Sequence, residues 1–148
     1  MRRLAATLTL MAVLVAGVAS SWAQAPAPGA QAALARAKQL DEQVVELYGE
    51  RKFADATPLA EQSLTIKEQA LGPTHPDVTG SLANLALLYK AQGDYAKAEP
   101  LYARALAIRE KALGPLHPDV ASNLANLALL YKAQGDYAKA EPLYARAL

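Results

Sequence analysis

The segment LANLALLYKAQGDYAKAEPLYARAL, residues 82–106, recurs without a change as residues 124–148. The tetrapeptide HPDV precedes both copies, at 75–78 and 117–120, so the period is 42 residues. One period further upstream, a diverged copy keeps Phe53, Ala56, Pro58 and Leu59 at the positions of Tyr95, Ala98, Pro100 and Leu101. Self-similarity at a fixed period of this length is typical of solenoids and arrays of stacked units.

Each period predicts two helices. In the second copy, Leu82, Leu85, Ala86 and Tyr89 stand at i, i+3, i+4 and i+7, which places them on one helical face. Gly93-Asp94 predicts a break, because Gly favours a left-handed C-terminal position and Asp caps a following helix well. A second helix with the same spacing then runs to Gly114-Pro115, and His117-Pro118-Asp119 predicts the next helix start. The sequence therefore predicts an all-α chain.

The repeated residues resemble the tetratricopeptide repeat (TPR) family, and the 42-residue period with the ALGP-x-HPDV joint is similar to its kinesin-light-chain type. Two residues differ from the usual pattern: Leu82 replaces Trp, and Ala86 replaces Gly. The resemblance is weakest in the first helix, around Gln43 and Leu47. It implies a right-handed α-solenoid of antiparallel helix pairs with about three repeats. These are a degenerate first repeat at 32–74, a second at 75–116 and an incomplete third at 117–148.

The N-terminal residues predict an export signal. Arg2 and Arg3 precede an uncharged run from Leu4 to Ala19, and Ser21-Trp22-Ala23 fits the small-x-small rule of signal peptidase. The run has 16 residues, fewer than the ~20 needed to span a bilayer. We therefore expect a signal peptide at 1–23, a flexible linker at 24–31, and an exported protein, periplasmic or secreted, that is not inserted in the membrane after cleavage.

Composition excludes several classes of function. With 15 Lys+Arg against 14 Asp+Glu, the chain lacks the basic excess of a nucleic-acid binder. It has no Cys, so a thiolate metal site and a Cys nucleophile are excluded. The only histidines, His75 and His117, each precede Pro-Asp at a repeat joint and have no neighbouring ligand pattern, which indicates a turn rather than a metal or catalytic site. We expect no catalysis and no cofactor.

The first helix of each pair has a second face that is not part of the predicted core. Because TPR proteins line a concave groove with this face, the resemblance implies a peptide site in which Asn pairs with peptide backbone and Lys with carboxylates. An apolar Leu on such a face also favours a binding surface. The candidates are Ala83, Asn84, Leu87 and Lys90 in the second copy and Ala125, Asn126, Leu129 and Lys132 in the third.

These observations predict an exported protein–protein interaction module that binds a protein or peptide. The alternative is the recognition part of a larger effector, such as a CHAT-type peptidase, and the coding sequence beyond Leu148 would distinguish the two. Because the third copy repeats the second, the face that the second packs on the third is expected to be free on the third. We expect Leu127, Tyr131 and Tyr144 to be exposed there, with fraying or self-association as the result.

Overall fold

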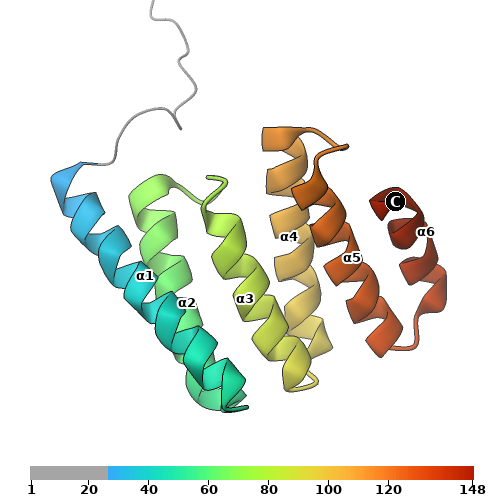
Figure 1. The fold of residues 1–148 in the computed structure, drawn as a ribbon, viewed down its shortest axis with the longest axis horizontal. Helices are drawn as coiled ribbons and strands as arrows, with labels where there is room; N and C mark the ends of the chain where they lie inside the picture. Colours follow the sequence, from blue (N-terminus) through green and yellow to red (C-terminus); the bar gives the residue numbers. More distant parts are fainter. Residues whose placement is uncertain (1–26) are drawn as a thin grey trace, which may run out of the picture.

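The computed structural model describes residues 27–148, all of whose regular structure is α-helical; the predicted signal peptide lies outside them. The six helices form three antiparallel pairs that stack side by side (Figure 1). This arrangement confirms the all-α solenoid of about three repeats. The helices are α1 (Pro28–Gly49), α2 (Phe53–Leu71), α3 (Val78–Ala91), α4 (Tyr95–Leu113), α5 (Pro118–Ala133) and α6 (Tyr137–Ala147).

Helix α1 begins earlier than the composition of its first residues suggests. A flexible linker was expected up to Gln31, but the helix starts at Pro28. Proline is favoured in the first turn, since its missing N–H would have no intrahelical partner there. The Ala-rich residues that follow are strong helix formers, so the linker prediction is wrong for residues 28–31.

The predicted Gly-Asp breaks separate the helices of the second and third pairs. Gly93 and Gly135 have φ of 79° and 80°, in the left-handed region where a side chain is strained. The carboxylates of Asp94 and Asp136 then accept hydrogen bonds from the backbone N–H groups of Lys97 and Lys139. The break predicted from the sequence is therefore confirmed at both joints.

The core consists of two clusters, and each joins one helix pair to the first helix of the next. Val78, Leu82, Leu85 and Leu88 of α3 pack into the cluster of the first pair. Their counterparts in α5 are Val120, Leu124, Leu127 and Leu130, which pack with Tyr102 and Leu106 of α4. Leu127 is only 6% exposed, so the expectation that it lies on a free face is wrong: its side chain points back onto α4.

Small residues allow the two helices of a pair to approach closely. Ala56, Ala98 and Ala140 occupy the same repeat position and are all buried. No helix in residues 27–148 combines the length and the apolar character needed to cross a bilayer.

Candidate functional site

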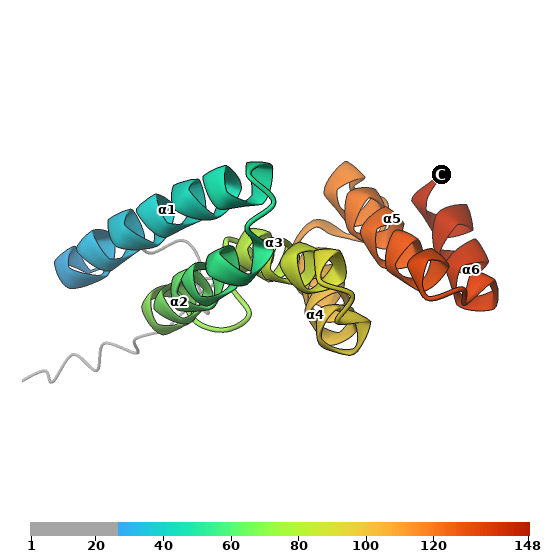
Figure 2. The ribbon, with the colours of Figure 1, turned by 90° about the horizontal axis from the view of Figure 1, so that it is seen from below.

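The first helices of the three pairs line one side of the stack. Figure 2 shows α1, α3 and α5 along this side, with α2, α4 and α6 along the other. Since the period is 42 residues, each of the three helices presents equivalent positions to the same side. These positions form three rows, each with one residue per helix: Glu42, Asn84 and Asn126; Val45, Leu87 and Leu129; and Tyr48, Lys90 and Lys132.

The middle row is apolar and accessible. Val45 is 65% exposed and Leu129 43%, while Leu87 is half-buried. Leu87 is less exposed because it lines a cavity of about 80 Å³ between α1 and α3, together with Val45, Tyr48 and Asn84. None of these three apolar side chains belongs to either core cluster, although two of them are exposed to solvent.

The structure brings the predicted site residues together only in part. Asn84 and Leu87 lie on the wall of the cavity between α1 and α3. Ala83 is half-buried and packs against the second core cluster, so its contact is with the protein interior. Lys90 is half-buried whereas Lys132 is exposed. Of the remaining candidates in the third repeat, Ala125 and Asn126 are half-buried and Leu129 is exposed.

Sequence analysis missed the contribution of α1 to this side. Val45, Tyr48 and Glu42 stand one period before Leu87, Lys90 and Asn84, but the first copy has diverged in this helix. Tyr48 packs its ring against Phe53, with the ring centroids 5.2 Å apart. The 42-residue register alone would have identified these three residues, whereas residue identity could not.

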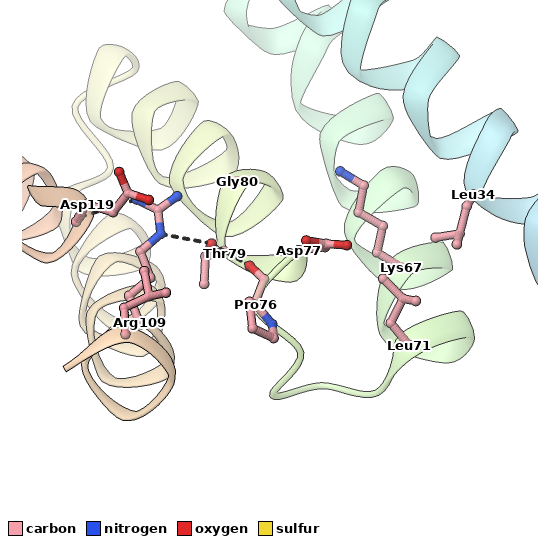
Figure 3. Close-up of a pocket in the computed structure, with 10 residues that line it drawn as sticks. Leu34, Lys67, Leu71, Pro76, Asp77, Thr79, Gly80, Arg109 and Asp119 are labelled. Carbon is pink, nitrogen blue, oxygen red and sulfur yellow. Dashed lines mark hydrogen bonds between the residues drawn. The ribbon is translucent and has the colours of Figure 1, made fainter. Parts of the chain in front are cut away.

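A larger pocket of about 600 Å³ lies at the edge where the first helices begin (Figure 3). Lys67 and Arg109 reach it from α2 and α4, and the carboxylates of Asp77 and Asp119 lie on its rim. Both cations are engaged with the protein. Lys67 Nζ lies 2.6 Å from Asp41 Oδ2 and 2.8 Å from Ser81 Oγ, and Arg109 Nε donates to Thr79 Oγ1 at 3.0 Å. This pocket is therefore of mixed charge.

The two histidines have the turn role that their sequence context predicts. The Nδ1 atoms of His75 and His117 accept hydrogen bonds from the backbone N–H groups of Asp77 and Asp119, at 3.2 and 3.1 Å. Nδ1 therefore acts as an acceptor in both turns. His117 is the N-cap of α5, whereas the N-cap of α3 is Asp77, two residues after His75. Within residues 27–148, no three side chains of His, Asp or Glu gather in a way that could hold a metal ion.

Helix pairs that stack through repeated joints and present one face of their first helices define an α-solenoid. The family model of the tetratricopeptide repeat matches residues 45–111 and 78–148, and the chain belongs to this family. No significant similarity to a curated protein was found.

Three solved structures are similar to this chain in fold. BtubC (BKLC) from P. vanneervenii is 31% identical, with a TM-score of 0.69 over 75% of this chain and 44% of that one. A kinesin light chain homologue of Podospora anserina with nearly identical TPR-like repeats is 27% identical, with a TM-score of 0.70 over 77% and 54%. The TPR domain of Arabidopsis FLU, 16% identical, shares the fold with a TM-score of 0.66 over 80% and 93%. The chain spans about half the length of the first two structures.

Proposed function

We propose that this TPR chain is an exported interaction module that binds a peptide segment of a protein partner along the side formed by α1, α3 and α5. The observation that carries the proposal is the apolar row of Val45, Leu87 and Leu129, in which Val45 and Leu129 are exposed and Leu87 is half-buried. An apolar row with polar rows beside it has the composition of a peptide-binding surface, where burial of apolar side chains supplies affinity and placed polar groups supply orientation.

The neighbouring rows define the chemistry of the ligand. The amides of Asn84 and Asn126 each offer a donor and an acceptor, which suits the backbone of an extended peptide. Lys90 and Lys132 lie beyond the apolar row on α3 and α5, whereas α1 carries Glu42 and Tyr48 in the equivalent outer rows. An acidic residue of the ligand is therefore favoured next to α3 and α5, and a basic residue next to Glu42.

A peptide-array screen with the purified protein tests the site. Ligands are expected to have apolar residues flanked by acidic ones, and binding should weaken at least about tenfold with Leu87→Asp plus Leu129→Asp. Lys90→Glu plus Lys132→Glu should change the preference away from acidic ligands. The matched control is Lys111→Glu, which reverses a charge at an exposed position of α4. If the affinity for the ligands were unchanged in both double variants, the binding site would lie elsewhere on the protein.

Export is tested by the fluorescence of the mature protein. The only tryptophan, Trp22, precedes the expected cleavage between Ala23 and Gln24, so exported material should emit only from its seven tyrosines. Tryptophan emission from that material would show that the segment is retained. Should the coding sequence continue beyond Leu148 into an effector domain, the side formed by α1, α3 and α5 would serve as its recognition part.

A further inference from the structure

The cavity of about 80 Å³ between α1 and α3 has a buried floor and an accessible rim. Its floor is formed by Val44 and Leu88, which are 3% and 0% exposed and belong to the core cluster of the first pair. Its rim is formed by the other lining residues, Val45, Tyr48, Asn84 and Leu87. Because the floor is part of the closely packed core, it cannot move far to admit a larger group.

The α1 wall of this cavity has diverged from the other repeats, whereas the α3 wall has not. On α3, Asn84, Leu87 and Leu88 have identical counterparts one period later. On α1, the wall consists of Val44, Val45 and Tyr48, and the residues one period later are Ala86, Leu87 and Lys90. The lining of this cavity therefore differs from the equivalent position between α3 and α5 only on the α1 side.

Tyr48 is the largest of these differences. Its ring lies against that of Phe53, the first residue of α2, with the ring centroids 5.2 Å apart and the planes tilted by 56°. This contact favours one position of the Tyr48 ring. A lysine at the same position would offer only a flexible chain whose charged end stays in water. Tyr48 thus forms a fixed side wall, and at 36% exposure it remains accessible to a ligand.

The volume of the cavity limits the group that it can hold. An apolar cavity of about 150 Å³ binds benzene. The cavity between α1 and α3 has about 80 Å³, roughly half of that volume. It is too small for an aromatic ring, but it has room for an isopropyl group, which is the branched end of leucine and the whole side chain of valine.

We propose that this cavity holds the isopropyl group of one leucine or valine of the peptide ligand, and that Tyr48 is the residue that excludes an aromatic side chain. The inference rests on the proposed function, since the ligand is the peptide that binds along α1, α3 and α5. The charges on either side define the neighbours of this anchor residue. Glu42 lies on α1 and Lys90 on α3, so the ligand has a basic residue on the α1 side of the anchor and an acidic residue on the α3 side.

The first test uses a peptide library with Arg before the anchor position, Asp after it, and Leu, Val, Ala, Phe or Trp at the anchor itself. The whole protein should bind the Leu and Val peptides at least about tenfold more tightly than the other three, because only an isopropyl group fills the cavity. Tyr48→Ala removes the side wall and should make the Phe peptide bind as tightly as the Leu peptide. Urea midpoints show whether each variant is folded.

A matched pair of variants separates the wall from a general effect of replacing a tyrosine. Tyr48→Lys introduces the residue that α3 has at this position, and it should abolish the preference for Leu over Phe. Tyr137→Lys makes the same change at an exposed position of α6 and should retain that preference.

A second measurement needs no peptide. Propane has the size of an isopropyl group, and it should shift the methyl resonances of Val45 and Leu87 in NMR spectra of the whole protein. Benzene should shift them only in Tyr48→Ala. If propane left both residues unshifted, the inference would be overturned, whether or not a peptide binds.

Failure of this inference can be distinguished from failure of the proposed function. If Leu87→Asp plus Leu129→Asp weakened binding but the Tyr48 variants left the anchor preference unchanged, the peptide site would stand and the role of Tyr48 would be wrong. If binding were insensitive to that double variant, the proposed function would fail. The propane shifts would then decide separately whether the cavity accepts an aliphatic group.

Discussion

Tyr131 donates its hydroxyl to the carboxylate of Glu99 across the joint between the second and third repeats, and Tyr89 makes the same bond to Glu61 one joint earlier. The two tyrosines are one period apart, but the two acceptors are not. Glu61 aligns with Ala103, and Glu99 aligns with Thr57. The acceptor has moved by four residues, one turn on the same face of the second helix, so the bond is retained although the sequence has diverged.

The tyrosine pKa values predict how stability changes at alkaline pH. The hydrogen bond to Glu61 raises the pKa of Tyr89 to about 12, and burial, with the bond to Glu99, does the same for Tyr131. Burial raises the pKa of Tyr102 to about 12. The fold thus favours the neutral phenols. Their contribution to stability is fully present below the ordinary pKa of 10.0 and should be lost as pH rises to about 12.

Spectroscopic titration of tyrosinate checks this prediction. We expect a late phase, near pH 12, in which Tyr89, Tyr102 and Tyr131 ionise. Glu61→Ala should lower the pKa of Tyr89 more than Glu99→Ala lowers that of Tyr131, because the hydrogen bond is the main cause only for Tyr89. A single phase at the ordinary tyrosine pKa would contradict the assignment of these hydroxyls.

The fold could be predicted because local and repeat signals agree. The spacing of Leu82, Leu85 and Tyr89 indicates a helical face, and Gly93-Asp94 marks its end. Both features depend only on residues that are close together in the sequence, so they can be recognised without the structure. The burial of Leu127 could not be derived in this way, because the helical wheel does not say which of two adjacent pairs an apolar side chain contacts. That depends on the angle at which the pairs stack.

The candidate site was predicted in α3 and α5 and missed in α1. Leu87 and Leu129 belong to identical copies, whereas Val45 stands in a helix with little residue identity to them. The polar network between α1, α2 and α3 was also missed. Asp41, Ser63, Lys67 and Ser81 come from three helices and have no shared spacing, so only the three-dimensional packing brings them together.

That network gives a second prediction. Asp41→Asn keeps the shape of the side chain but removes the charge that neutralises Lys67, and the two side chains are only 24% and 16% exposed. We expect a loss of about 1–3 kcal/mol in the free energy of unfolding, measured with urea. Glu50→Gln is the control, since it breaks an ion pair with Lys52 on the open surface and should have little effect. Equal effects of the two variants would mean that the network contributes no more than a surface pair.

A third prediction concerns the close approach of the helices within a pair. Ala98 is fully buried where α3 and α4 meet, so Ala98→Leu should overpack this contact and destabilise the protein by about 1–3 kcal/mol. Ala103→Leu makes the same change on the exposed face of α4 and should be nearly neutral. Thermal unfolding of the two variants measures the difference. If Ala98→Leu left the thermal stability unchanged, α3 and α4 could move apart to accept the larger side chain without a loss of stability.

A final prediction compares two glycines, Gly80 and Gly93, at which an added Cβ would meet no other atom within 4 Å. The two substitutions should change stability in opposite directions. Gly80 lies inside α3, and Gly93 has φ of 79° at the end of that helix. Gly80→Ala should stabilise the protein by about 0.5–1 kcal/mol, because alanine loses less backbone entropy in a helix. Gly93→Ala should destabilise it by about 1–2 kcal/mol, because the left-handed conformation brings Cβ close to the following carbonyl. Because an added methyl group has room at both sites, steric contact cannot explain a difference between the two variants. If the urea midpoints of both variants moved in the same direction, backbone conformation would not be the cause of the change in stability.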